Sequence, residues 1–159
     1  MIRAITTFFW IGLLPMAPGT LGSFAALPCG FLLVVFGGPF ALMMAAGVVF
    51  VVGLWATDKE TAGAADHDPG HIVIDEVVGQ WIALAPLAMK IGFFGGDIFI
   101  DLFVNLGLAF LLLRIFDIIK PFPVSWADRM HTPLGVMLDD VIAGIMAAVS
   151  VILLVQVFT

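Results

Sequence analysis

Residues 112–144 read LLRIFDIIKPFPVSWADRMHTPLGVMLDDVIAG. This stretch contains three of the six basic residues of the chain and four of its twelve acidic residues. An apolar run over 106–119 overlaps its start, and another apolar run over 136–158 begins near its end. Charged residues gathered between two apolar segments of membrane-spanning length are costly unless they are paired or functional. Other parts of the chain should therefore contain the partners of these charged residues.

The composition indicates a helical membrane protein. Hydrophobic residues make up 62% and charged residues 11% of the 159 residues, and the mean hydropathy is +1.19. Soluble domains are nearer half apolar and a quarter charged. We therefore expect an all-α, polytopic bundle, with one domain over residues 1–159 and four to five apolar segments. The net charge of −6 excludes a nucleic-acid-binding role, which needs a basic surface.

Proline, glycine and charged residues divide the chain into the segments of this bundle. We expect residues 1–14 to be an uncleaved segment at the membrane interface, followed by a breaker-rich loop over 15–23. A glycine-proline turn at 37–39 predicts a helical hairpin around it. The expected elements are the hairpin helices 24–36 and 40–56, a polar stretch over 57–76, an apolar run over 77–94, a turn at 95–97, a helix over 98–119, a loop over 121–133 and a last span over 136–158.

The basic residues predict an orientation. If each apolar run crosses the membrane once, five of the six lie on the same side, and the sixth, Lys90, lies within a run. An excess of lysine and arginine marks the cytoplasmic side. We therefore expect the regions 1–23, 57–76 and 114–140 to share the cytoplasmic face. The five residues are Arg3, Lys59, Arg114, Lys120 and Arg129.

Two carboxylate pairs stand where apolar runs begin. Asp75 and Glu76 precede the run over 77–94, and Asp139 and Asp140 are flanked by apolar residues near the start of the last span. Acidic residues at helix starts are also favoured by the helix dipole, which offers a structural alternative. Charges inside apolar sequence are usually paired or functional, so the two pairs together favour a site. We expect these four residues to be catalytic and to hold a metal ion.

Cations accompany these acids. Arg114, Asp117 and Lys120 are spaced i, i+3, i+6, which predicts one stripe at the end of a helix, and Asp128 and Arg129 follow in the loop. Carboxylates are preferred Mg²⁺ ligands, and lysine and arginine bind phosphoryl oxygens. Mg²⁺ would neutralise a phosphate and lower the pKa of a bound water. The combination predicts metal-dependent phosphoryl chemistry, with all five residues as candidates for substrate binding.

The segment PGTLGS (18–23) is a weaker candidate. Thr20 and Ser23 could present hydroxyl donors to a phosphate, and the glycines could present backbone donors at a helix start. The segment lacks the Gly-Lys-Ser/Thr ending of a P-loop.

Four segments carry a resemblance to the phosphatidylglycerophosphatase A family of bacterial membrane phosphatases. They are PGTLGS (18–23), IVIDEVVGQWIAL (72–84), RIFDIIKPFP (114–123), and DR with GVMLDD and AG (128–144). The resemblance implies Mg²⁺-dependent hydrolysis of phosphatidylglycerophosphate to phosphatidylglycerol and inorganic phosphate, within glycerophospholipid biosynthesis. It also implies a helical, multi-pass protein of the bacterial cytoplasmic (inner) membrane, acting on a phospholipid in that membrane.

Carried over by position, the resemblance makes five acids the acidic centre and Lys120 and Arg129 the basic phosphate contacts, with Arg114 as a further one. The five acids are Asp75, Glu76, Asp117, Asp139 and Asp140. The nucleophile stays open between a water activated by the metal and a carboxylate. A small cation carrier is the alternative function, because carboxylates within a membrane also mark ion paths.

Overall fold

The computed structural model describes the backbone of residues 1–63, 69–94 and 98–158, and the side chains of residues 1–63, 69–92 and 104–154. Over these residues the fold is all-α, as the composition predicts. The elements are α1 (Ile2–Thr6), η1 (Ile11–Leu13), α2 (Pro18–Thr61), α3 (Ile74–Ala83), α4 (Ala85–Met89), the π-helical η2 (Lys90–Phe94), α5 (Ile98–Ile119), α6 (Val124–Asp128) and α7 (Pro133–Phe158).

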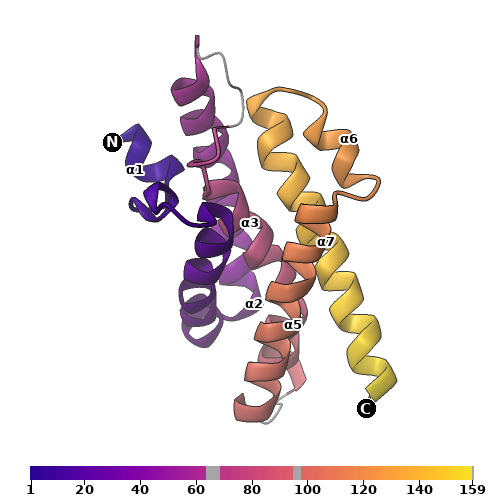
Figure 1. The fold of residues 1–159 in the computed structure, drawn as a ribbon. Helices are drawn as coiled ribbons and strands as arrows, with labels where there is room; N and C mark the ends of the chain where they lie inside the picture. Colours follow the sequence, from indigo (N-terminus) through magenta and orange to yellow (C-terminus); the bar gives the residue numbers. More distant parts are fainter. Residues whose placement is uncertain (64–68, 95–97, 159) are drawn as a thin grey trace.

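Helix α3 lies at the centre of the bundle. It packs against α2 on one side and against α7 on the other, and α7 also contacts α5 and α6 (Figure 1). The core forms where these helices meet, and its fully buried members include Ala26, Leu84, Leu113 and Ala143. The polar start of α3 is therefore enclosed by helices that come from both ends of the chain.

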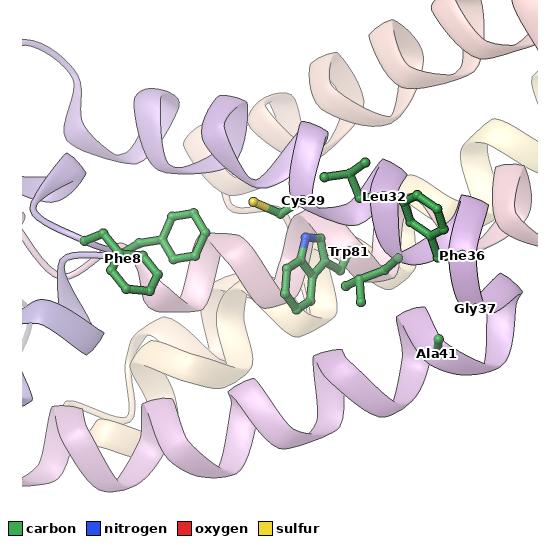
Figure 2. A pocket seen from close by; sticks show the side chains of 9 residues that line it. Phe8, Cys29, Leu32, Phe36, Gly37, Ala41 and Trp81 are labelled. Carbon is green, nitrogen blue, oxygen red and sulfur yellow. The ribbon is translucent and has the colours of Figure 1, made fainter.

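Helix α2 is a hairpin of two limbs that bend at Gly38. This residue has φ 68° and ψ −167°, a conformation that glycine adopts at little cost, and Pro39 follows it. The two limbs lie side by side in Figure 2, so the hairpin predicted around residues 37–39 is present. The expected loop over 15–23 is wrong for residues 18–23. The helix already begins at Pro18, because proline at the first helical position has its φ preset and loses no hydrogen bond.

The apolar run over 77–94 was predicted as one segment, but it is three. Helix α3 ends at Ala83, α4 starts at Ala85, and η2 completes the run. Pro86 accounts for the first break, since it cannot donate a backbone hydrogen bond to the preceding turn. Helix α3 also begins at Ile74, so Asp75 and Glu76 lie in its first turn and not in a loop.

The helix predicted over 98–119 matches α5, whereas the turn expected at 95–97 lies outside the described residues. The predicted loop over 121–133 contains a short helix, α6, and the last helix starts at Pro133.

Two of the described helices are long and apolar enough to cross a membrane, judged by length and composition. They are Pro18–Thr61 and the portion Pro133–Leu154 of α7. The bundle of four to five spans stays a prediction. The N-terminal segment contains only α1 and η1 as short helices, and Phe9 and Trp10 between them are exposed.

An apolar cavity of about 600 Å³ opens between the two limbs of α2 (Figure 2). Cys29, Leu32 and Phe36 of the first limb line it, together with Phe8 and Trp81. The Trp81 indole reaches the first limb, where Nε1 donates to the carbonyl of Ala26 at 2.9 Å. Among the described residues, no acidic or basic side chain lines this cavity, so the charged candidate residues lie elsewhere.

Candidate functional site

Three carboxylates converge where α3 and α7 meet. Asp75, Glu76 and Asp140 each offer an oxygen, and these oxygens lie within 4.8 Å of one another. Asp75 is 7% exposed and Asp140 is 2% exposed. Oδ1 of Asp140 is buried and accepts no hydrogen bond from the described residues, which fits a position that a cation would occupy. An all-oxygen donor set suits a hard cation, so this cluster could hold a metal ion.

Two glycines set the distance between α3 and α7. A Cβ on Gly79 would lie 2.7 Å from the backbone oxygen of Asp140, and a Cβ on Gly144 would lie 2.5 Å from the backbone oxygen of Gly79. The two backbones are therefore in contact, which small residues permit. Gly79 follows Asp75 by four residues and Gly144 follows Asp140 by four. Asp75 and Asp140 therefore each lie one helical turn before the glycine at this crossing.

The Glu76 carboxylate occupies space left by two glycines of α2. A Cβ on Gly19 would collide with Oε1 of Glu76, and a Cβ on Gly22 would lie 3.3 Å from Oε2. PGTLGS is the weaker candidate for donors to a phosphate, and in the structure its glycines make room for an acid of α3. Ser23 remains close to the charges, since its hydroxyl accepts a hydrogen bond from Nη1 of Arg114 at 3.2 Å. Thr20 is half-buried in the first turn of α2.

Arg114 of α5 joins the acids to α2. Its Nη2 lies 2.9 Å from Oδ2 of Asp117, and its Nη1 lies 3.8 Å from Oε1 of Glu76. The Arg114 side chain is 14% exposed, so the guanidinium places positive charge inside the protein beside the carboxylate cluster. The i, i+3 pair of Arg114 and Asp117 is the one that the sequence predicted.

Lys120 does not continue this pair, so the predicted stripe of three residues is wrong at its end. Helix α5 stops at Ile119, and Lys120 has φ 47°, outside the helical region. Pro121 explains the departure, because a proline disfavours the helical conformation of the residue before it. The ammonium group of Lys120 instead bonds Asp128 of α6, and it donates to Oδ2 of Asp139 at 2.9 Å.

The two residues of the predicted Asp139–Asp140 pair therefore belong to two different clusters of charged side chains. Neighbouring residues on a helix point in directions about 100° apart. Asp140 faces the acids of α3, and Asp139 faces Lys120.

Opposing effects act on the pKa of Lys120. Partial burial lowers it, whereas the hydrogen bonds and charges of Asp128 and Asp139 raise it by more. The net result is a pKa above the usual value for lysine. Lys120 is thus a permanent cation at neutral pH. An ammonium group has three donor hydrogens, and two of them are directed at these carboxylates.

This raised pKa predicts a pH dependence of stability. A raised pKa in the folded state stabilises the fold fully below the unfolded pKa, which is about 10.4, and the stabilisation is lost as pH rises through the folded pKa. The difference in Tm between the parent protein and Lys120→Met should therefore stay constant from about pH 7 to about pH 9 and shrink above about pH 10.4. Thermal melts across this pH range measure it. A difference in Tm that already shrinks near pH 8 would contradict the pairing of Lys120 with the two carboxylates. Lys59→Met, at an exposed lysine, is the matched control.

Of the predicted site residues, the structure brings nine into two neighbouring groups. One contains Asp75, Glu76, Asp140, Arg114, Asp117 and Ser23, and the other contains Lys120, Asp128 and Asp139. Arg129 is exposed after α6. Its contact with a phosphate, like that of Thr20, stays a prediction. Gly144, at the crossing of α3 and α7, was not among the predicted residues, although its spacing of four residues after an acid in apolar sequence could have indicated it.

Comparisons with known proteins agree with this arrangement. Residues 4–155 match the model of the family described as phosphatidylglycerophosphatase A. The chain is 33% identical over 142 residues to phosphatidylglycerophosphatase A of Escherichia coli, which covers 88% of the chain and 75% of that relative. It is 34% identical over 151 residues to the protein of that name from Haemophilus influenzae, covering 94% of the chain and 86% of the relative.

A third relative carries a different name. It is the putative phosphatidylinositol-3-phosphatase of Bacteroides thetaiotaomicron, 35% identical over 150 residues, which cover 89% of the chain and 85% of the relative. No solved structure matches the chain. The family model spans most of the chain, including every residue of the two groups described above, and two relatives above 30% identity share its name. The chain therefore belongs to the phosphatidylglycerophosphatase A family of lipid phosphatases.

Proposed function

We propose that this protein hydrolyses phosphatidylglycerophosphate to phosphatidylglycerol and inorganic phosphate, at the cytoplasmic face of the bacterial inner membrane. The observation that carries the proposal is the buried cluster of Asp75, Glu76 and Asp140 with Arg114 beside it. Membership of a lipid phosphatase family favours this function over the cation carrier. Residues 1–159 would form one multi-pass domain, and the length and apolarity of α2 and α7 support that placement.

Mg²⁺ is the proposed cofactor, held by Asp75, Glu76 and Asp140. When bound, Mg²⁺ supplies positive charge that neutralises the phosphate monoester and the developing charge on its oxygens. The three carboxylates come from two helices whose backbones touch, so the ligand positions are fixed by the packing and not by a loop. Asp139 was predicted as a fourth ligand. We now assign it the different task of holding Lys120.

Arg114 and Lys120 are the proposed phosphate contacts of this chain. Asp117 and Ser23 hold the Arg114 guanidinium in place, which reduces the entropy lost when it binds a phosphoryl oxygen. The third donor hydrogen of Lys120 remains for the substrate after the bonds to Asp128 and Asp139. Arg129, which is exposed after α6, would meet a phosphate at the surface.

The reaction breaks the bond between phosphorus and the ester oxygen of the glycerol. A water oxygen forms the new bond to phosphorus, one proton of that water goes to a carboxylate of the cluster, and the leaving alkoxide takes a proton from solvent water to become the alcohol. The products are phosphatidylglycerol and inorganic phosphate. A buried carboxylate suits the role of base because the protein fixes its position relative to the phosphate.

The test is phosphate release by the purified protein in detergent micelles that contain a single phospholipid. We expect release from phosphatidylglycerophosphate in the presence of Mg²⁺ and none above background in EDTA. Phosphatidylinositol 3-phosphate is the second substrate to compare, because one relative is named a phosphatase of that lipid. A higher kcat/KM for phosphatidylinositol 3-phosphate would overturn the proposed substrate while keeping the phosphatase chemistry. Full activity in EDTA would overturn the proposed cofactor.

A further inference from the structure

Gln80 of α3 is a buried polar residue that the site described above does not use. Its side chain is 0% exposed. Neither Oε1 nor Nε2 has a hydrogen-bond partner among the described residues. A carboxamide carries two donor hydrogens and an accepting oxygen, and burying it without partners costs free energy. Such a group in a native protein needs an explanation, and a ligand-bound state in which it is satisfied is one.

The position of Gln80 relates it to Glu76. It follows Glu76 by four residues in α3, so the two side chains lie on the same face, one turn apart. That face meets α2, because Glu76 lies against Gly19 and Gly22. Helical side chains lean toward the N-terminus of their helix, which here is the direction of Glu76. The Gln80 carboxamide can therefore reach the Glu76 carboxylate.

We propose that Gln80 is a positioning residue of the metal site, donating a hydrogen bond from Nε2 to the Glu76 carboxylate when a divalent cation is bound. The proposal rests on the metal site of the proposed function. A carboxylate ligand needs an outer hydrogen bond to fix its orientation. Arg114 faces the same carboxylate, with its Nη1 3.8 Å from Oε1 of Glu76, and Gln80 would add a neutral donor from the helix that carries Glu76.

This role has opposite consequences for stability and for metal binding. In the metal-free protein the buried amide has no partner among the described residues, so its replacement by an apolar side chain of the same size should stabilise the fold. In the metal-loaded protein the same replacement removes the bond that orients Glu76, so metal affinity should fall. A purely structural glutamine would make both quantities fall together.

The experiment uses the full chain in detergent and Mn²⁺ as the probe, with free Mn²⁺ measured by electron paramagnetic resonance. Gln80→Met keeps the length of the side chain and removes both polar atoms. We expect the Kd for Mn²⁺ to rise by about 10–100-fold, as for other outer-shell changes. We expect the metal-free Tm to rise by about 2–4 °C. Gln80→Leu is the second variant if Gln80→Met does not fold.

Thr57→Val is the matched control. The hydroxyl of Thr57 in α2 is also buried without a partner among the described residues, and it lies outside the acidic cluster. We expect this variant to raise the Tm and to leave Mn²⁺ binding unchanged.

The outcomes separate the two proposals. If the parent protein binds no Mn²⁺, the metal site fails and the role of Gln80 fails with it. If the parent binds Mn²⁺ and Gln80→Met binds it equally well, the metal site stands and the positioning role is overturned. A fall in both Tm and affinity would likewise reject the positioning role, because it would show a structural one.

Discussion

Asp140→Asn should abolish most of the phosphatase activity while leaving the protein folded. Changing an outer-shell partner of a metal ligand already costs about 10–100-fold, so losing a ligand should cost more than about 100-fold in kcat/KM. Asparagine has nearly the shape of aspartate, so the contact of the Asp140 backbone with Gly79 is kept. The variant also removes one of three neighbouring negative charges, so the metal-free Tm should be equal to that of the parent or higher.

Phosphate release from phosphatidylglycerophosphate at saturating Mg²⁺ measures the loss, and a thermal melt of the same preparation checks the fold. Asp58→Asn is the matched control. Its side chain is 63% exposed on α2, so we expect activity close to that of the parent. Activity of Asp140→Asn within about tenfold of the parent would reject Asp140 as a ligand, since even an outer-shell residue costs about that much.

The sequence predicted the parts of the site that depend on local spacing. The pair of Arg114 and Asp117 follows from an i, i+3 spacing in a helix whose limits, 98–119, could be read from a proline and an apolar run. The carboxylate pairs could be found because charges inside apolar sequence are rare. These inferences need only the geometry of one helix.

The contacts between helices could not be predicted in the same way. Helices α5 and α7 have apolar residues around their whole circumference and no single apolar face, so the sequence does not show which face of each turns inward. That rotation decides that Asp140, and not Asp139, meets Asp75. It also decides that the glycines of α2 face Glu76. The direction of Lys120 has a local cause, because Pro121 disfavours the helical conformation at the residue before it and so takes Lys120 out of the i, i+3, i+6 stripe.

Gly144→Ala should move Asp140 of α7 away from Asp75 and Glu76 of α3, which together form the proposed metal site. The added Cβ would lie 2.5 Å from the backbone oxygen of Gly79 and 3.1 Å from its Cα. Backbone atoms cannot rotate away as a flexible side chain can, so α3 and α7 must move apart. We expect a loss of about 1–3 kcal/mol in the free energy of unfolding, as in other overpacked interiors. Because Asp75 and Asp140 stand one turn from this contact, the Mg²⁺ concentration for half-maximal activity should rise as well.

Gly107→Ala is the control that makes this result specific, since a Cβ at Gly107 of α5 meets nothing within 4 Å. Alanine in the middle of a helix is favoured over glycine by about 0.5–1 kcal/mol, so this variant should be slightly more stable than the parent and need the same Mg²⁺. The same change from glycine to alanine is thus expected to lower stability at Gly144 and to raise it at Gly107. Only the change at Gly144 should alter the Mg²⁺ requirement. A Gly144→Ala protein with the Tm and the Mg²⁺ dependence of the parent would show that the distance between α3 and α7 does not set the geometry of the carboxylate cluster.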